Sequence, residues 1–203
     1  LQDILLHSKK PFALLHGQEG VGQGAVVSAL SRFLQSEDAP KRLKGATIHR
    51  FSFEEFLFRP KDDEYKYAVD ALKALIQETE THNKSGKPPI ILYLDDMGRH
   101  AGDPKHSQRD NFLAMRNVLE RQLRSHSVPL IGSVTDEELF ALNSIDKGLM
   151  KQFQRVDVPP LSMENTLKEI RHIADELEGI HGIKISNEAL EHLTKKVDIN
   201  LPL

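Results

Sequence analysis

The residues most able to do chemistry form a glycine-rich run, Gly-Gln-Glu-Gly-Val-Gly-Gln-Gly, at positions 17–24. Between a strand and a helix, such a run can bind phosphate, because backbone N–H groups converge at the helix N-terminus. The phosphate-loop pattern is G-x-x-x-x-G-K-[ST]. Gly17 and Gly22 occupy its glycine positions, but Gln23 replaces the lysine and Gly24 replaces the hydroxyl residue. The sequence therefore predicts a phosphate cradle without its ammonium and without its magnesium-binding hydroxyl.

A second candidate group is the acidic pair Asp95-Asp96, which directly follows the apolar run Ile90–Leu94. In nucleotide hydrolases, one acid at the end of a buried strand holds the magnesium shell and a neighbouring acid polarises the attacking water. The alternative is an ordinary strand-end turn or helix cap, where Asp is common. The glycine-rich run has a similar alternative, a plain strand-to-helix turn.

A parallel sheet is needed to position these groups, and apolar runs alternating with helical patterns predict one. The predicted strands are 12–16, 47–52, 90–95, 130–133 and 155–158, and the predicted helices are 2–8, 25–34, 63–81, 109–125 and 136–142. The polar stretch 99–110 is predicted to be a loop. Pro159-Pro160 interrupts the pattern. We therefore expect an α/β domain over residues 1–158 and a small helical segment over 159–203.

Composition excludes several classes of protein. Charged residues make up 28% of the 203 residues, and the net charge of −3 gives no general attraction for nucleic acid or anionic lipid. The absence of cysteine excludes a disulfide framework and fits the cytoplasm or another reducing compartment, such as an organelle interior. No run approaches the roughly 18 apolar residues of a membrane span. Because the sequence starts at Leu1 and ends at Leu203, we expect it to be a piece of a longer protein.

Several segments, taken together and in order, resemble the first AAA+ module of the Clp unfoldases and disaggregases. Residues 17–25 are similar to G-E-P-G-V-G-K-T-A, 130–138 to C-I-G-A-T-T-x-D-E, and 145–154 to K-D-A-A-L-E-R-R-F-Q. Residues 42–45 resemble the turn before the second strand, and 158–166 resemble the entry to the helical lid. The resemblance covers nearly the whole chain. It implies an α/β fold: an AAA+ P-loop NTPase core with a five-stranded parallel sheet in an αβα sandwich, followed by a partial, truncated helical lid.

The resemblance also implies a site for ATP or ADP with magnesium. The residues it places around the nucleotide are Gly17, Gln18, Glu19, Gly20, Val21, Gly22, Gln23, Gly24 and Ala25 in the loop, and Leu167 and Ile170 on the lid helix. It makes Asp95 the metal ligand and gives catalytic positions to Asp96, Thr135 and Lys151. Thr135 stands where the family reads the γ-phosphate, but it is equally placed to cap the helix that follows.

The departures from the family all concern one activity. Besides the two loop residues, Asp96 replaces the usual glutamate. The side chain is one methylene shorter, so its carboxylate lies further from the γ-phosphate, and such small displacements lower the rate of hydrolysis. Lys151 and Gln152 stand where two arginines reach into the neighbouring subunit's site, and a lysine cannot form the planar guanidinium clamp. Residues 59–64 lack the aromatic of the substrate-gripping pore loop.

We therefore expect a degenerate module, a pseudo-ATPase that binds ATP or ADP weakly or not at all. It would serve a homo- or hetero-oligomer, a hexameric ring by the resemblance, that remodels protein substrates or partner proteins. Two alternatives stay open. One is an active ATP-hydrolysing Clp-type unfoldase, in which Asp96 acts as the base. The other is a non-enzymatic AAA+ scaffold or adaptor. The resemblance also leads us to expect an intact second AAA+ module beyond Leu203.

Overall fold

The computed structural model describes residues 1–7, 9–52, 64–98, 106–125 and 128–200. Contacts divide the chain into two compact units, Leu1–Val158 and Pro159–Leu203. Each unit is described by itself. None of the helices in the described ranges is long and apolar enough to cross a membrane.

The first unit is built on one parallel sheet of five strands in the order β2-β3-β4-β1-β5. The strands are β1 (Phe12–Gly17), β2 (Thr47–Ser52), β3 (Ile90–Asp95), β4 (Leu130–Thr135) and β5 (Gln154–Asp157). The three inner strands are almost continuously buried, whereas the edge strands β2 and β5 expose several residues. This is the pattern of a parallel sheet covered on both faces. The predicted five-stranded α/β fold is confirmed.

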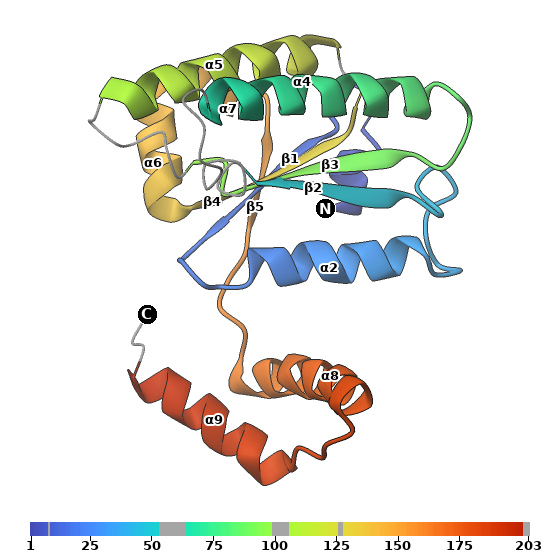
Figure 1. Cartoon of the computed structure of the whole chain (residues 1–203), viewed down its shortest axis with the longest axis vertical. Helices are drawn as coiled ribbons and strands as arrows, with labels where there is room; N and C mark the ends of the chain where they lie inside the picture. Colours follow the sequence, from blue (N-terminus) through green and yellow to red (C-terminus); the bar gives the residue numbers. More distant parts are fainter. Residues whose placement is uncertain (8, 53–63, 99–105, 126–127, 201–203) are drawn as a thin grey trace. The chain divides into compact units, whose positions relative to one another are not determined.

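Helices cover both faces of the sheet, which makes an αβα sandwich (Figure 1). The helices of this unit are α1 (Gln2–Leu5), α2 (Gln23–Leu34), α4 (Glu64–Asn83), α5 (His106–Ser125), α6 (Asp136–Ile145) and α7 (Lys147–Met150). Alternate strand residues pack into two separate cores. Leu15, Ile91 and Ile131 pack with α2 on one face, and Phe12 and Leu92 pack with α4 and α5 on the other.

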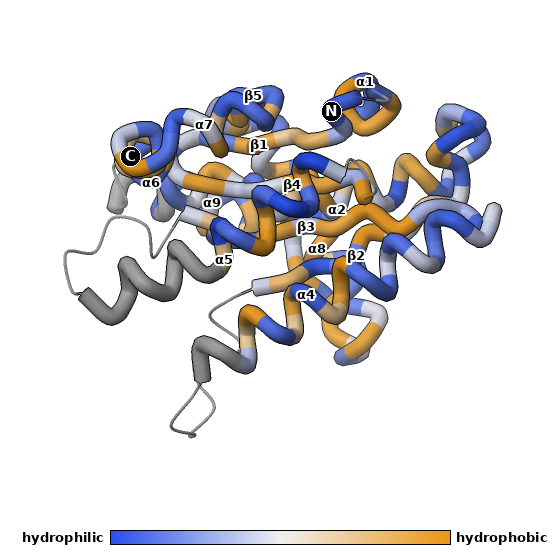
Figure 2. Tube along the Cα trace, turned by 90° about the horizontal axis from the view of Figure 1, so that it is seen from above, coloured by the Kyte–Doolittle hydropathy of each residue, from blue (hydrophilic) through white to orange (hydrophobic). Residues whose placement is uncertain are grey.

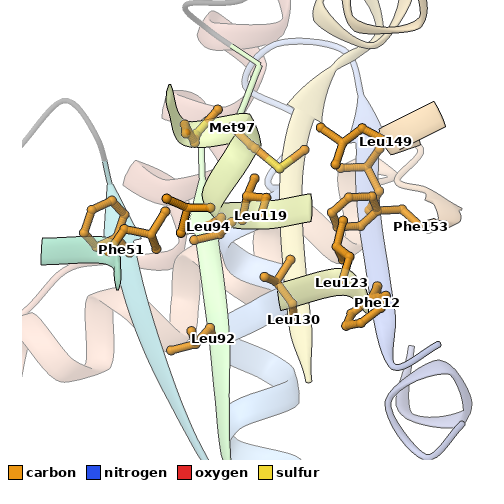
Figure 3. Close-up of a cluster of buried hydrophobic side chains, with 14 of the residues drawn as sticks. Phe12, Phe51, Leu92, Leu94, Met97, Leu119, Leu123, Leu130, Leu149 and Phe153 are labelled. Carbon is orange, nitrogen blue, oxygen red and sulfur yellow. The ribbon is translucent and has the colours of Figure 1, made fainter. Parts of the chain in front are cut away.

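Figure 3 shows the second of these cores, in which Leu119 and Leu123 of α5 lie against Leu94 and Leu130. Hydrophobic residues concentrate in the central strands, and polar residues are interspersed along α4 (Figure 2). Burial of these leucines stabilises the sandwich by about 1.5–3 kcal/mol per side chain. The core therefore fixes the strand ends from which the candidate site is built.

Two local predictions were wrong. Residues 106–108, predicted to be loop, lie in α5, which begins three residues before the predicted start at 109. The short helix α7 was not predicted at all. Its N-cap is Asp146, whose Oδ1 accepts a hydrogen bond of 3.0 Å from the N–H of Leu149. Arg116 of α5 pairs with the same carboxylate. The cap is visible in the sequence, but its partner Arg116 is 30 residues away.

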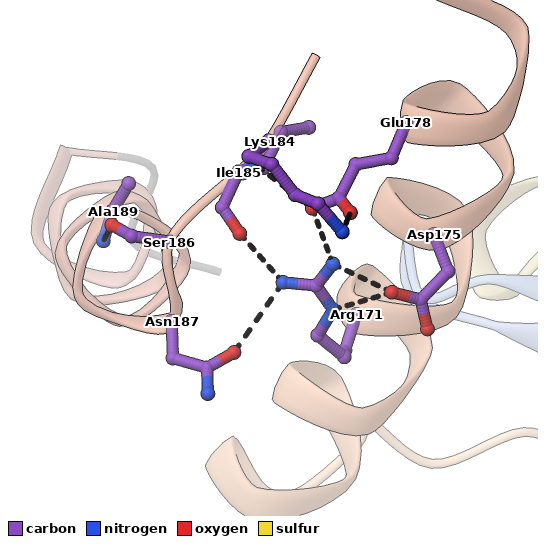
Figure 4. A network of polar contacts seen from close by, with 8 residues as sticks. All are labelled: Arg171, Asp175, Glu178, Lys184, Ile185, Ser186, Asn187 and Ala189. Carbon is purple, nitrogen blue, oxygen red and sulfur yellow. Dashed lines mark hydrogen bonds and ion pairs between the residues drawn. The ribbon is translucent and has the colours of Figure 1, made fainter. Parts of the chain in front are cut away.

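The second unit consists of α8 (Met163–His181) and α9 (Asn187–Asn200). Arg171 joins the helices: its guanidinium donates to Asp175, to Glu178, to the carbonyl of Ile185 and to Asn187 (Figure 4). Glu178 in turn accepts a 2.7 Å hydrogen bond from the N–H of Ile185. One charge network therefore fixes the turn between the helices.

This network predicts an unusual titration of Glu178. The N–H of Ile185, followed by the guanidinium of Arg171, stabilises the carboxylate and lowers the pKa of Glu178 from 4.5 to about 2. Because the folded-state pKa is depressed, the network's contribution to stability is complete above pH 4.5 and is lost as the pH falls towards 2. Carbon-detected NMR of the Glu178 carboxyl should give a midpoint near 2.

Two variants that each remove one positive charge from α8 test this prediction, and the second is the control. Arg171→Gln should raise the midpoint, whereas Lys168→Gln should leave it unchanged, because Lys168 pairs with Glu164 at 2.7 Å. A wild-type midpoint near 4.5 would contradict the network as described.

Candidate nucleotide site

Three of the chemically interesting segments meet at one edge of the sheet. Gly17, the last residue of β1, pairs in register with Thr135 at the end of β4. Asp95 ends β3, which lies beside β4. The carboxyl ends of parallel strands form the usual ligand crevice of α/β folds. The fold thus brings the glycine-rich loop, the acidic pair and Thr135 together, as the sequence analysis required.

The loop has the backbone geometry of an anion cradle. Gly20 and Gly22 have positive φ values of 78° and 98°, which glycine adopts without strain. Gly22 is also the N-cap of α2, and no side chain caps that helix. The N–H groups of the first turn of α2 consequently have no intrahelical acceptor and carry the positive end of the helix dipole. Val21 is buried in the core beside α2 and anchors the loop.

Gln23, at the lysine position of the loop, binds the sheet. Its side-chain Nε2 donates a 2.8 Å hydrogen bond to the carbonyl of Val134 on β4. This bond ties α2 to the carboxyl end of the sheet and uses the amide that replaces the ammonium. The next residue, Gly24, is exposed, and a Cβ added there meets no atom within 4 Å. A threonine therefore fits at position 24 without displacing any neighbour.

Asp95 is held by three protein donors. Its Oδ2 accepts from Nε of Arg50 at 2.7 Å, and its Oδ1 accepts from the hydroxyls of Tyr93 at 2.6 Å and Ser133 at 3.0 Å. Burial opposes ionisation of Asp95, but these hydrogen bonds outweigh it and lower the pKa of the carboxyl below its ordinary value. Burial and the neighbouring carboxylate raise the pKa of Tyr93, so its hydroxyl stays a donor.

These residues are poorly arranged to hold a magnesium ion directly. Mg²⁺ requires near-octahedral oxygen ligands at about 2.0–2.1 Å, and both oxygens of Asp95 already accept strong hydrogen bonds. Gly24 offers no hydroxyl ligand.

Asp96 and Thr135 lie at the same edge, each with a local structural role. Asp96 adopts a positive φ of 53°, and its N–H donates to Oγ of Ser133 at 3.2 Å. Thr135 forms a capping box with Glu138: its Oγ1 accepts from the N–H of Glu138 at 3.1 Å, and Oε2 of Glu138 accepts from the N–H of Thr135 at 2.9 Å. The cap uses only an acceptor lone pair of the Thr135 hydroxyl, so it is compatible with the predicted γ-phosphate contact.

Comparison with known proteins gives a consistent result, although no family model matches the chain. The chaperone ClpB of Meiothermus ruber is 33% identical over 188 residues, which cover 92% of this chain and 21% of that protein. ClpB of Lactiplantibacillus plantarum is 28% identical over 196 residues, or 96% of this chain and 22% of that protein. The chain is an AAA+ module of the Clp family. It spans about a fifth of the length of these curated relatives.

Solved structures agree with the fold of the Clp-family module. A closed-state reconstruction of Hsp104 with ATPγS and FITC-casein matches with a TM-score of 0.75 and 22% identity over 98% of this chain and 32% of that chain. The complex of S. cerevisiae Hsp104 with ADP matches with a TM-score of 0.74 and 21% identity over 99% of this chain and 27% of that chain. At these identities the likeness shows the fold alone.

Three other predicted site residues of the Clp-family module lie near α7 and on α8. Lys151 is exposed at the end of α7, before β5, whose first residue pairs with Ala13 near the start of β1. Leu167 and Ile170 are half-buried on α8 in the second unit. Their roles stay predictions. In the predicted pore segment, residues 59–63 lie outside the described residues.

Sequence reasoning missed the partners of the Clp-family site. Arg50, Tyr93 and Ser133 hold Asp95, and His16 lies beside the loop with its Nδ1 donating to Oδ1 of Asp136 at 2.8 Å. Tyr93 was recognisable in principle, because residues i and i+2 share one face of a strand. The others depend on strand register.

Proposed function

We propose that this module is a degenerate AAA+ ATPase domain of a Clp-type chaperone, which binds ATP or ADP weakly and does not hydrolyse it. One observation carries the proposal: the residue at the lysine position, Gln23, is uncharged, and its amide donates to Val134 on β4. The cradle keeps its backbone donors and helix dipole. It lacks a charge-assisted contact of about 1.5–3 kcal/mol, which corresponds to roughly one to two decades in affinity.

In this proposal the module contributes to assembly. It would take part in a homo- or hetero-oligomer, a hexameric ring by family resemblance, that acts on protein substrates, as casein accompanies Hsp104 in one solved structure. Exposed Lys151 would then be an interface charge and not a bidentate clamp. Remodelling would be powered by another module or subunit.

The alternatives keep some support. Asp96 and Thr135 lie at the loop edge of the sheet, which favours residual hydrolysis. The Asp95 carboxylate is already bonded to Arg50, which favours the other alternative, an AAA+ scaffold or adaptor that binds no nucleotide.

A titration of the full-length protein with fluorescent ADP tests the proposal. Gly22→Val should abolish binding, because a β-branched residue is strained at the φ of +98° that shapes the cradle. Gly86→Val is the matched control, because Gly86 also has a positive φ, of +77°, and a Cβ added there would meet no atom within 4 Å. Gly86 precedes the amino end of β3, at the opposite end of that strand from Asp95.

The expected result is a weak phase of binding that Gly22→Val removes and Gly86→Val retains, separate from binding at the second AAA+ module that we expect. If Gly22→Val removes no phase of binding, any nucleotide binds elsewhere, which favours the scaffold alternative. Tight wild-type binding lost in Gly22→Val would favour the active enzyme.

A further inference from the structure

The position of Arg50 is set by the sheet. In the pairing of β2 with β3, Ser52 lies opposite Asp95 and Arg50 lies opposite Tyr93. The guanidinium therefore reaches the carboxylate diagonally, across one residue pair, and Nε approaches Oδ2 to 2.7 Å. The Asp95 side chain is only 20% exposed, against 54% for Arg50. The contact thus joins a largely buried anion to a cation at the rim of the site.

A carboxylate in this position needs a positive partner. A nucleotide brings several negative charges to the loop, and an uncompensated Asp95 beside them would repel the phosphates. A bound divalent cation is one source of compensation, but at Oδ2 it would compete with the charge-assisted bond from Arg50. At Oδ1 it would compete with the hydroxyls of Tyr93 and Ser133, and Tyr93 is buried, at 3% exposure.

We propose that Arg50 permanently supplies the positive charge at Asp95, so that the loop binds a nucleotide polyphosphate without a divalent cation. The inference rests on the proposed weak nucleotide binding and deepens it, because it specifies the ligand as the metal-free form. Arg50 acts through Asp95 and is a positioning residue. In this site a guanidinium that belongs to the protein supplies the positive charge that a bound metal ion would otherwise supply.

The proposal predicts different changes of ADP affinity for two variants, one that removes the positive charge of Arg50 and one that removes the negative charge of Asp95. Arg50→Gln leaves Asp95 uncompensated, so binding of fluorescent ADP in EDTA should weaken by about tenfold. Magnesium should restore this loss, because the freed carboxylate accepts the ion. Asp95→Asn removes the anion and leaves the guanidinium, so ADP affinity should be unchanged or a few-fold higher. If Asp95 were a magnesium ligand, Asp95→Asn would weaken binding.

The experiment measures ADP binding to the full-length protein in EDTA and in Mg²⁺, and Mn²⁺ binding by electron paramagnetic resonance. For the binding that Gly22→Val removes, wild-type affinities should agree within about threefold between the two conditions, and wild-type protein should bind no more Mn²⁺ than Gly22→Val does. Arg155→Gln is the control, since Arg155 lies on the other edge strand and donates to Asn143 at 2.8 Å. It should behave as wild type.

Three results would overturn the proposal: Gly22-dependent wild-type binding that tightens tenfold or more with Mg²⁺, weakened Gly22-dependent binding in Asp95→Asn, or no gain of Mn²⁺ in Arg50→Gln over wild type. If the protein binds no ADP in either condition, the proposed nucleotide binding fails. The Mn²⁺ comparison of wild type with Arg50→Gln then decides separately whether the arginine excludes the metal.

Discussion

Replacing Gln23 by lysine and Gly24 by threonine together is expected to raise the affinity for ADP with magnesium by about 10- to 100-fold. The cradle that receives the phosphates is already formed, so the new ammonium adds a charge-assisted contact without reshaping the loop. Position 24 has open space for the threonine. The lost bond to Val134 should cost about 1 kcal/mol of folding stability, which chemical denaturation measures separately.

Gln35→Lys is the matched control for this gain. Gln35 lies at the other end of α2, and its Nε2 likewise donates to a backbone carbonyl, that of Ala46, at 2.7 Å. The same change of charge there should leave ADP affinity unaltered. If the double variant gains nothing, or if Gln35→Lys gains as much, loss of the loop lysine is not what weakens the site.

Gly17→Ala is expected to lower the free energy of unfolding by about 2–3 kcal/mol. A Cβ on Gly17 would lie 2.5 Å from the carbonyl oxygen of Val158 and 3.1 Å from Cγ1 of Val21. The first of these is backbone, so relief requires a shift of the chain after β5. That shift would disturb the 2.8 Å hydrogen bond from the N–H of Val158 to the carbonyl of His16.

The same substitution at Gly24 provides the control. Gly24 lies in the first turn of α2 with open space around it, and alanine is a better helix former than glycine by up to about 1 kcal/mol. Chemical denaturation should therefore show Gly24→Ala as stable as wild type or more so. A Gly17→Ala protein of wild-type stability would show that the contact with Val158 is not constrained.

Features set by neighbouring residues were predictable from the sequence. The apolar runs predicted all five strands, and the three inner ones form such runs because inner strands of a parallel sheet are buried on both faces. The capping role of Thr135 was predictable because Glu138 lies three residues further on.

Features set by strand register were not predictable. Arg50 and Asp95 are 45 residues apart, and only the register of β2 against β3 brings them together. Gln23 binds Val134 across 111 residues, so the sequence predicted a missing lysine but not the bond that replaces it. In both cases the chemistry of the site depends on where a long side chain points, which spacing along the chain does not specify.

The most direct test of the central claim is phosphate release from ATP by the full-length protein in magnesium, with wild type compared to Asp96→Asn. Asparagine has the same shape and tolerates the left-handed backbone at this position, where φ is 53°. A module without working hydrolytic chemistry predicts equal rates for the two proteins. A magnesium-dependent rate that falls by about 10²-fold or more in Asp96→Asn would contradict the account and make this module an active ATPase.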